Sequence, residues 1–510
     1  MMSVYVLTFI FGLVTLALLK IIYPPWNFPK NIPTIPFYVT FLTTLWDFDQ
    51  EDIFNLYLRE PLEKYGAVKL YFGSRWNVVV SRPELLAQMF KDEDTFAKSG
   101  NHIKIPYGVI SAYTGENVIS AHGAIWKIFR RTITPGLQIF DHRPMVEHAD
   151  LFCSLISKQL AKNVTLCPKR TLSHPLATSD FESQSTSGEV VMPELIQRLS
   201  LANISKVALG LDIGTLTRDN SDLHEQLKNV KSNIFKALYL NFPMLDLLPI
   251  PSRRRARKYV EDFRRSLMKS VKANLVNNYT FEQTSFASSD LIRSFNREEI
   301  SEKQLIDNIV IIMVAGHENP QLLLTSCFYM LAKHKSWQRK IREEVRDCNV
   351  DKLGELPLLN SFIFECIRLY PPLSQLINRC TTRKCVLGTD IVLPKGAYVG
   401  YNVMSTGRYK SGWGESADNF MPERWGASID KIMNEWRHRK NTCNMGAFHG
   451  GRRACLGEKL ALLEVRITMA TVLRSFEWTL APDWADRVTS AGPLCPLGLK
   501  LIFSELCTSE

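Results

Sequence analysis

Ten residues that end at Gly457 combine the residue types needed to hold a metal through a thiolate: Phe-His-Gly-Gly-Arg-Arg-Ala-Cys-Leu-Gly. Gly451 and Gly457 flank Cys455 and permit a turn, and the close approach of a flat macrocycle, that a side chain would block. Backbone N–H groups in such a turn can point at the sulfur. Phe448 can cover the sulfur, and Arg453 can pair with an acidic group of the bound molecule. The alternative is that Cys455 is a small buried apolar residue, as most free cysteines are.

This spacing, Phe-x-x-Gly-x-Arg-x-Cys-x-Gly, resembles the haem-binding signature of the cytochrome P450 superfamily. The resemblance implies haem b (iron protoporphyrin IX) with Cys455 as its axial thiolate, and Arg453 at a haem propionate. A thiolate trans to the oxygen site donates electron density to the iron and favours cleavage of the O–O bond.

Two further motifs appear in the order that the family has. Glu365 and Arg368 lie one turn apart on a predicted helix, where they would otherwise form a solvated surface pair. The resemblance implies that Arg424, in Phe-Met-Pro-Glu-Arg-Trp, joins them in a buried network behind the haem. Such a network fixes geometry and is not catalytic.

Besides Arg453, the resemblance implies three further residues at the haem propionates. Trp126 and Arg130 match the family's Trp-x-x-x-Arg and share one helical face. Without the resemblance, this segment is an amphipathic helix with a basic stripe. Arg379 lies where the family has another propionate-binding arginine, but no tight motif surrounds it.

An apolar run that precedes Pro320 predicts a helix buried through the domain centre. Ala315 and Gly316 resemble the family's oxygen-activating element, in which small residues pass beside bound oxygen and an acid–alcohol pair relays protons. Glu318 fits the acid position, and Asn319 replaces the alcohol. Asn319 either positions a water for proton delivery or only satisfies carbonyls freed by Pro320, which lacks an N–H.

Within the family, residues 31–37, 315–320, 448–462 and 492–497 together resemble the fungal dityrosine-forming oxidases, which couple N-formyl-tyrosine phenols for spore walls, and related secondary-metabolism enzymes. The resemblance implies a phenolic substrate. Loss of a hydrogen atom from a phenol gives a radical, and two such rings can join without oxygen insertion.

We expect the substrate pocket to be walled by residues 99–119, 373–377 and 494–497. The polar side chains expected to face the ring are Tyr107, Tyr113, Asn117, Ser374 and Gln375. Two other classes stay open at this point: a haem-thiolate isomerase or dehydratase that needs no external electrons, and a haem sensor or carrier that is not an enzyme.

The composition agrees with one large domain. The 510 residues are 45% hydrophobic and 22% charged, and eleven cysteines without regular spacing do not form a disulfide framework. The resemblance implies a mostly α fold with a small β region, the cytochrome P450 fold, over residues 38–510. A Ser/Thr-rich stretch, 163–190, is predicted to be a surface insertion between two helices.

The N-terminus predicts a membrane anchor. Residues 3–19 carry no charge and Lys20 follows, so residues 1–23 are just long enough for one transmembrane helix. A cleaved signal peptide is disfavoured because no basic residue precedes the run and no small-x-small site follows it. A proline-rich hinge, 24–37, comes next. The resemblance implies a single-pass protein of the endoplasmic reticulum with a cytosolic catalytic domain, where sequons at Asn163, Asn203 and Asn278 would go unused.

The net charge of +11 is explained by membrane lipid and acidic protein partners, because no nucleic-acid-binding motif accompanies it. The basic run 253–258, beside the apolar segment 234–250, is either an ordinary solvated face or, in a membrane-anchored enzyme, a surface that rests on anionic lipid near a substrate entrance. The chain ends too soon after Cys455 to hold flavin domains, so we expect electrons from a separate NADPH-cytochrome P450 reductase, with cytochrome b5 as a second donor. The predicted docking face consists of Lys127, Arg131, Arg437, Arg439, Lys440 and Arg452.

Overall fold

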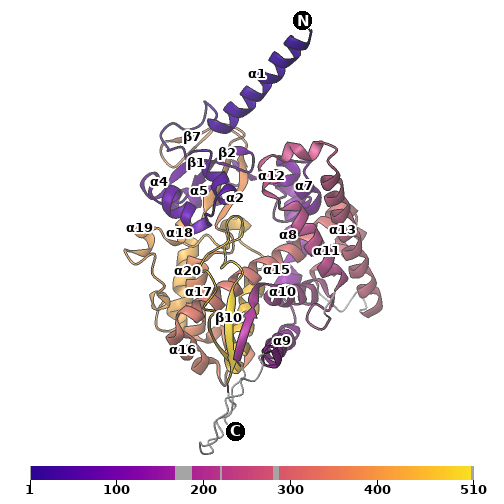
Figure 1. Ribbon diagram of the computed structural model, residues 1–510, viewed down its shortest axis with the longest axis vertical. Coiled ribbons are helices and arrows are strands. Elements are labelled where there is room, and N and C mark those ends of the chain that lie inside the picture. The colour runs from indigo at the N-terminus through magenta and orange to yellow at the C-terminus, as the bar shows by residue number, and fades with distance from the viewer. Residues whose placement is uncertain (1, 167–186, 219–220, 279–285, 507–510) are drawn as a thin grey trace, which may run out of the picture.

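The computed structural model describes residues 2–166, 187–218, 221–278 and 286–506, and most of them are helical, as predicted (Figure 1). The α-helices are α1 (Met2–Ile22), α2 (Val39–Leu45), α3 (Gln50–Ile53), α4 (Arg59–Tyr65), α5 (Pro83–Lys91), α6 (Asn101–Lys104), α7 (Val109–Thr114), α8 (Gly123–Gln138), α9 (Arg143–Leu166), α10 (Met192–Leu209), α11 (Asp222–Ile234), α12 (Ala237–Asn241), α13 (Pro251–Asn278), α14 (Ala287–Asn296), α15 (Glu302–Lys333), α16 (Lys335–Val345), α17 (Pro357–Leu369), α18 (Val403–Gly407), α19 (Lys410–Trp413), α20 (Ile429–Asn441) and α21 (Glu458–Ser475). Shorter 3-10 or π turns are η1 (Phe54–Leu58), η2 (Pro243–Leu247), η3 (Val350–Glu355), η4 (Pro422–Trp425) and η5 (Gly451–Arg453).

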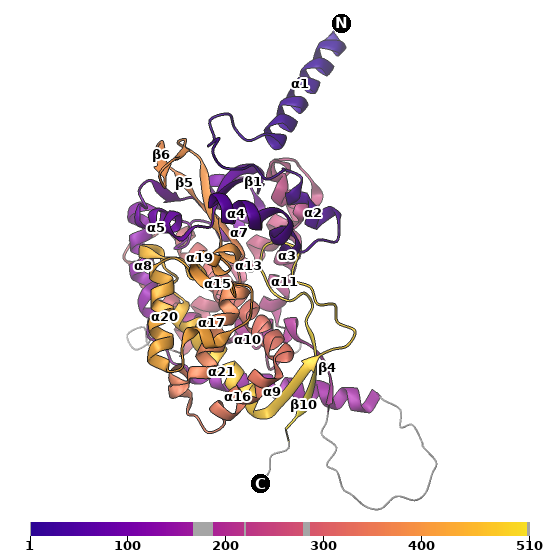
Figure 2. The same ribbon diagram turned by 90° about the vertical axis from the view of Figure 1, so that its left-hand side faces the viewer.

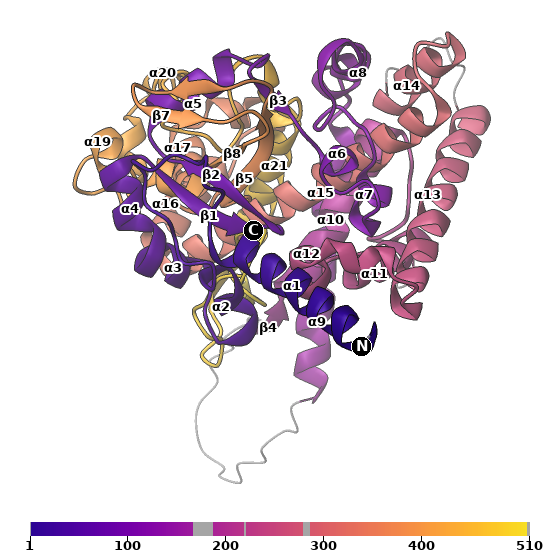
Figure 3. The same ribbon diagram turned by 90° about the horizontal axis from the view of Figure 1, so that it is seen from above.

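The β region is small and split into three sheets. The strands are β1 (Ala67–Phe72), β2 (Arg75–Val80), β3 (Phe96–Lys98), β4 (Ser187–Val191), β5 (Gln375–Thr381), β6 (Cys385–Leu387), β7 (Ile391–Leu393), β8 (Tyr398–Asn402), β9 (Phe476–Leu480) and β10 (Lys500–Glu505). Their orders are β1-β2-β8-β5-β3, β4-β10-β9 and β6-β7. Seen from above, the five-stranded sheet lies on one side of α15 and helices α13 and α14 lie on the other (Figure 3).

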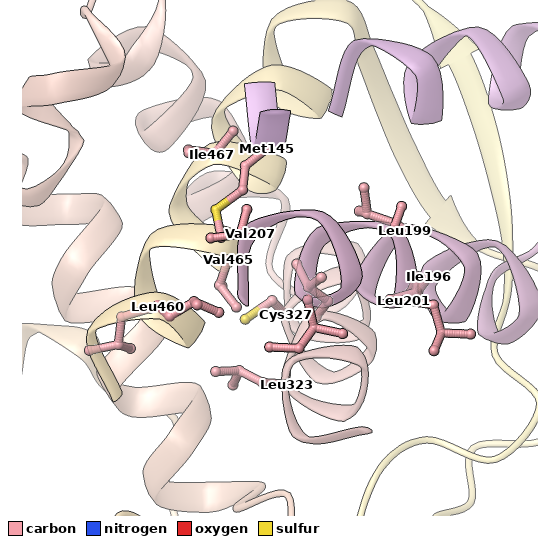
Figure 4. Packing of buried hydrophobic residues seen from close by; sticks show 14 of the residues in the cluster. Met145, Ile196, Leu199, Leu201, Val207, Leu323, Cys327, Leu460, Val465 and Ile467 are labelled. Atoms are coloured by element: carbon pink, nitrogen blue, oxygen red, sulfur yellow. The ribbon is translucent and has the colours of Figure 1, made fainter. Parts of the chain in front are cut away.

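The long helix α15 is the centre of the domain. It begins with a capping box, in which Ser301 and Gln304 satisfy each other's backbone N–H groups, and most of its length is buried. Apolar side chains of α10 and α21 surround it, among them Ile196 and Leu460, while Leu323 and Cys327 project from α15 itself (Figure 4). The prediction of a buried central helix is therefore confirmed.

The N-terminal segment leaves the domain as a single helix. Figures 1 and 2 show α1 projecting away from the remaining elements, and its base is held where Trp76 Nε1 donates to the Lys20 carbonyl at 3.2 Å. Among the residues that the structure describes, none of the helices combines the length and the apolar character needed to cross a membrane. The predicted span therefore stays a prediction.

The predicted hinge, 24–37, packs on the five-stranded sheet for part of its length. Ile32 and Ile35 are buried, Thr34 forms a bridge to Lys69, and the Lys69 ammonium donates to the Pro29 carbonyl at 2.8 Å.

Three details of the sequence analysis are corrected or limited. Most of the predicted insertion, 163–190, lies outside the described residues, but its end is not a loop because β4 pairs with β10. Arg253 does not face lipid: it is buried and bonded to Asp246 at 2.5 Å. Asn203 is buried against His148, which makes its sequon inaccessible in the folded chain, and the side chains of the other two sequons lie outside the described ones.

Candidate functional site

A cavity of about 250 Å³ opens between α8, α15, α21, the start of β5 and the Cys455 loop. It is lined by Lys98, Val118, Ile119, Trp126, Arg130, Ile133, Leu137, Ile204, Ile311, Ile312, Ala315, Gly316, Asn319, Pro320, Leu323, Ile367, Pro372, Leu373, Leu376, Asn378, Ala447, Phe448, His449, Arg453, Ala454, Cys455, Leu456, Gly457, Leu460 and Ala461. Several residues predicted from separate motifs thus meet in one place.

The loop that carries Cys455 is shaped by its glycines and by α5. Gly451 has φ +61°, and a Cβ there would lie 2.9 Å from the Phe90 carbonyl oxygen. Gly457 has an ordinary φ, but a Cβ there would meet no protein atom within 4 Å, and the residue borders the cavity. The turn is closed by the Cys455 N–H, which donates to the Phe448 carbonyl at 2.9 Å.

The Cys455 sulfur is accessible through the cavity although it lies deep in the fold. Burial raises the pKa of the Cys455 thiol, while hydrogen bonds from the Gly457 and Glu458 N–H groups and the charge of Arg130 lower it. The sulfur therefore accepts hydrogen bonds from the protein, but these do not offset the effect of burial. Most of the stabilisation of a thiolate has to come from a bound cation.

Arginine and tryptophan side chains from α8 and the loop crowd one edge of the cavity. Arg453 stacks 3.7 Å from the centre of the Trp126 ring, and it also pairs with Glu93. Arg130 donates to the Ala454 carbonyl at 3.1 Å, so α8 supports the loop directly. The predicted residues Trp126, Arg130 and Arg453 are brought together here.

Several N–H groups at this edge have no acceptor. Among the described residues, Trp126 Nε1 and Arg453 Nη1 and Nη2 are buried without a hydrogen-bond partner. Arg379 Nε and Nη2 also lack a partner, but Arg379 does not line the cavity and lies opposite Lys98, which does. Buried donors are normally satisfied, so this edge fits a ligand that brings acidic acceptors. The two propionates of haem are such acceptors, and the donor set therefore fits the group that the Cys455 loop suggests.

Lys98 and His449 were missed by the sequence analysis. Lys98 is buried in β3 directly opposite Arg379 of β5, and burial together with the charges of Arg379 and Arg453 lowers its pKa well below the ordinary value. His449 Nδ1 lies 2.7 Å from the Tyr401 hydroxyl. Only the pairing of β3 with β5 could have brought Lys98 to notice, because a single lysine in a strand forms no motif.

On the opposite side of the cavity, α15 contributes Ala315, Gly316 and Asn319, but not Glu318. Glu318 faces α11 instead, where its carboxylate lies 2.7 Å from the Lys231 ammonium. The same ammonium lies 2.7 Å from His317 Nε2. Burial and the Lys231 charge hold the pKa of His317 well below its usual range, so its ring is neutral and Nε2 accepts from Lys231.

Pro320 does not interrupt α15. Because Pro320 has no N–H, the Gly316 carbonyl lacks its usual donor in the helix. The Asn319 amide Nδ2 donates to the neighbouring carbonyl, that of Ala315, at 3.1 Å. Gly316 has a packing reason as well, because a Cβ there would lie 2.3 Å from Ile204 Cδ1 of α10.

The predicted structural network is assembled behind the cavity. Glu365 accepts from Arg368 at 2.7 and 2.8 Å and from Arg424 at 2.9 Å, and Trp425 donates to it at 3.1 Å. Glu365 and Arg368 are fully buried, and neither lines the cavity. This arrangement supports geometry and has no access to a substrate.

The prediction that polar side chains line the substrate cavity at these segments is wrong. The parts of the expected walls that face the cavity are the apolar residues Val118, Ile119, Leu373 and Leu376. Residues 494–497 do not line it. None of the polar residues proposed for that role lines it either: Tyr107, Tyr113, Asn117, Ser374 and Gln375. Ser374 and Gln375 face a second, smaller cavity on the other side of the segment.

The predicted docking cations differ in how free they are. Lys127, Arg437 and Arg452 are exposed, and Arg131 pairs with Glu299 at 3.2 Å. Arg439 and Lys440 are half-buried and pair with Glu435 and Glu458, so they contribute less free charge to this face.

Comparisons with known proteins agree with this site. The model of the cytochrome P450 family matches residues 33–495, and the chain belongs to this family. It is 55% identical over 487 residues to cytochrome P450-DIT2 of Saccharomyces cerevisiae, covering 95% of each chain, and 31% identical over 493 residues to cytochrome P450 monooxygenase xanG of Aspergillus fumigatus, covering 93% of this chain and 87% of that one. A plant relative, 11-oxo-beta-amyrin 30-oxidase of Glycyrrhiza uralensis, is 24% identical over 463 residues, covering 87% and 81%.

Membership defines the general chemistry. The chain is a cytochrome P450 monooxygenase, an oxidoreductase that uses haem with an axial cysteine thiolate, receives electrons from a redox partner and acts on a small molecule.

Proposed function

We propose that this enzyme oxidises or oxidatively couples tyrosine-derived phenols, with Cys455 as the thiolate ligand of the haem. The observation that carries the assignment of Cys455 is its place in the cavity, opposite α15 and beside a cluster of cations whose donors lack partners. A thiolate-bound haem supplies the activation of dioxygen.

The residues of the chain then have separate tasks. Lys98, Arg130, Arg453 and Trp126 line the cavity and would bind the two propionates, and Arg379, which does not line it, would support them from its place opposite Lys98. The Gly457 and Glu458 N–H groups stabilise the sulfur.

The wall of the cavity opposite the Cys455 loop suits an aromatic ring with one polar end. Most of the side chains there are aliphatic, and they include Val118, Ile311 and Leu373. Because Asn319 Nδ2 is bonded to the helix, its Oδ1 is left to accept a hydrogen bond from a phenol hydroxyl or a water. The resemblance of 31–37 and 492–497 to dityrosine-forming oxidases, together with 55% identity to cytochrome P450-DIT2, supports this substrate class.

The remaining proposals concern partners and location. Electrons come from NADPH-cytochrome P450 reductase, with cytochrome b5 as a second donor, at the face that carries Lys127, Arg437 and Arg452. The projecting helix α1 anchors the protein in the endoplasmic reticulum membrane as a single pass, with the domain in the cytosol. Exposed apolar side chains support contact with lipid at a second place, namely Phe235, Leu238, Met244, Leu247 and Leu248. Removal of residues 1–23 is expected to release the protein from membranes, and full retention on washed membranes would contradict the anchor.

The test is oxygen consumption by the purified enzyme with the reductase, NADPH and N-formyl-tyrosine. We expect consumption that depends on both the phenol and the reductase. An isomerase or dehydratase would turn over its substrate without NADPH, and a haem sensor would show no turnover in either case.

A further inference from the structure

The segment 107–119 borders the cavity and is held there by charged side chains from other elements. Val118 and Ile119 line the cavity. The Val118 N–H donates to Asn308 Oδ1 at 2.9 Å, and the Glu116 N–H donates to Asp307 Oδ2 at 2.9 Å. Two adjacent residues of α15 thus bind the backbone beside the two lining side chains.

Asp307 is completely buried, and its charge is balanced by cations. Arg264 of α13 lies 2.5 Å from one carboxylate oxygen, and Lys303 lies 3.0 Å from the other. Arg264 also donates to the Tyr113 carbonyl at 3.2 Å. Gly115 has φ +56°, and a Cβ there would lie 2.0 Å from Asp307 Cγ, so the segment closes directly onto this carboxylate.

A second buried pair holds the other end of the segment. Asp246 accepts from the Val109 N–H at 2.8 Å and pairs with Arg253 at 2.5 Å. Arg257 donates to the Tyr107 carbonyl. Backbone groups of surface segments usually bond to water, whereas charged side chains fix this segment at both ends.

We propose that Asp307 and Arg264 are positioning residues that set the width of the substrate cavity by fixing segment 107–119. Asp307 precedes Ile311, which lines the cavity, by one helical turn, so the same rigid helix carries one wall and the attachment of another. The proposal deepens the proposed function, since it assigns residues outside the cavity to the selection of its substrate.

The consequence for substitution is specific. Loss of the Asp307 carboxylate leaves the Arg264 charge without its partner and frees the Glu116 N–H, so Val118 and Ile119 lose their fixed place. Asp307→Asn keeps an oxygen that can accept the hydrogen bond from the Glu116 N–H, so it should disturb the position of the segment less than Asp307→Ala does.

The experiment compares dissociation constants of imidazole and 4-phenylimidazole for the haem-loaded enzyme, measured by their spectral shifts. 4-Phenylimidazole carries a phenyl ring that has to fit against the apolar lining of the cavity, whereas imidazole is much smaller. We expect Asp307→Ala and Arg264→Gln to raise the dissociation constant of 4-phenylimidazole by roughly tenfold relative to that of imidazole. The ratio for Asp307→Asn should lie between those of the wild type and Asp307→Ala. Lys303→Met removes the partner whose side chain is 70% exposed and should change neither constant.

The probes bind whether or not a phenol is the substrate, so the outcome is independent of the proposed function. An unchanged ratio of the two constants in Asp307→Asn and Arg264→Gln, both with normal haem content, would overturn the proposal. These two conservative variants also decide the matter if Asp307→Ala does not fold.

Discussion

At the scale of single residues, Cys455 is the side chain on which the proposed chemistry depends. Its sulfur faces the cavity, and only two backbone N–H groups and the Arg130 charge lower the pKa of the thiol, so a bound cation has to supply the remaining stabilisation of the thiolate. We predict that Cys455→Ala abolishes the long-wavelength Soret band that the reduced, carbon monoxide-bound form of a haem thiolate shows. Cys443→Ala, at a buried cysteine that does not line the cavity, is the control. Persistence of the band in Cys455→Ala would mean that the ligand is a different residue.

Glu464 predicts a pH dependence of stability. It is buried in α21, and burial raises its pKa to about 8, an effect that Ser200 and Asn203 oppose only in part. Because the folded pKa lies above the unfolded one, the native state holds a proton that the unfolded state has lost. Glu464 therefore lowers the free energy of unfolding as the pH rises from about 4.5 to about 8.

We expect Glu464→Gln to reduce the decrease of the free energy of unfolding between pH 4.5 and pH 8, and to raise that free energy at pH 8 by on the order of 3 kcal/mol. Denaturant titrations between pH 5 and pH 8, at roughly half-unit steps, would measure it. Glu415→Gln, at a carboxylate that is 89% exposed, should leave the pH profile as it is. Equal profiles for wild type and Glu464→Gln would refute the assignment.

The residues that the sequence revealed are those with fixed spacing. Cys455, Arg453 and Gly451 are close in sequence, and Glu365 and Arg368 share a helical face, so local patterns located them. Lys98 reaches the site only through strand pairing, and the apolar wall depends on which way segments 107–119 and 373–377 turn. Neither property is encoded in a local pattern.

At the scale of elements, the crossing of α10 and α15 explains Gly316. A Cβ at this position would approach Ile204 Cδ1 to 2.3 Å and Cγ1 to 2.4 Å inside a packed core. Gly316→Ala should therefore destabilise the protein by about 1–3 kcal/mol. Ile204→Ala removes both atoms, so the double variant should be more stable than the sum of the two single effects predicts. Strict additivity in a double-mutant cycle would contradict this explanation.

The pairing of α11 with α15 bears on proton delivery. Glu318 is bonded to Lys231 and does not line the cavity, so it can serve a relay only through water or by leaving Lys231. We predict that Glu318→Gln slows product formation and diverts electrons to peroxide, while the substrate-induced spectral shift stays the same. Glu302→Gln, at an exposed carboxylate of the same helix, is the control. Normal coupling of NADPH to product in Glu318→Gln would remove Glu318 from the relay.

At the scale of the whole molecule, the exposed cations beside the Cys455 loop predict an electrostatic docking face. Reversal of Lys127, Arg437 and Arg452 to Glu should slow the first electron transfer at low salt and matter less at high salt, since charges are screened over about 10 Å at 0.1 M. These three are preferred because Arg439 and Lys440 already pair within the chain.

A matched triple reversal at exposed positions of α13, which does not line the cavity, should leave reduction unchanged: Arg265, Lys269 and Lys272. Stopped-flow reduction measures both variants. Equal rates for the two triples at low salt would place the docking face elsewhere.

The general architecture was predictable because the motifs resemble those of a family whose fold is mostly α. The packing of residues 28–36 on the sheet and the pairing of β4 with β10 were not, since both join segments that are far apart in sequence. The prediction for Arg253 failed for a similar reason. A basic run in the sequence cannot show which of its members turns inward, and Arg253 pairs with the buried Asp246.

The central claim is that the thiolate-haem site oxidises a tyrosine-derived phenol with electrons from a reductase. The most direct measurement is mass spectrometry of the products formed from N-formyl-tyrosine under ¹⁸O₂, with Cys455→Ala as the blank. Coupling predicts a dimer that has lost two hydrogens and carries no ¹⁸O, and hydroxylation predicts a monomer with one ¹⁸O atom. Formation of neither product above the Cys455→Ala blank, with reductase and NADPH present, would contradict the account.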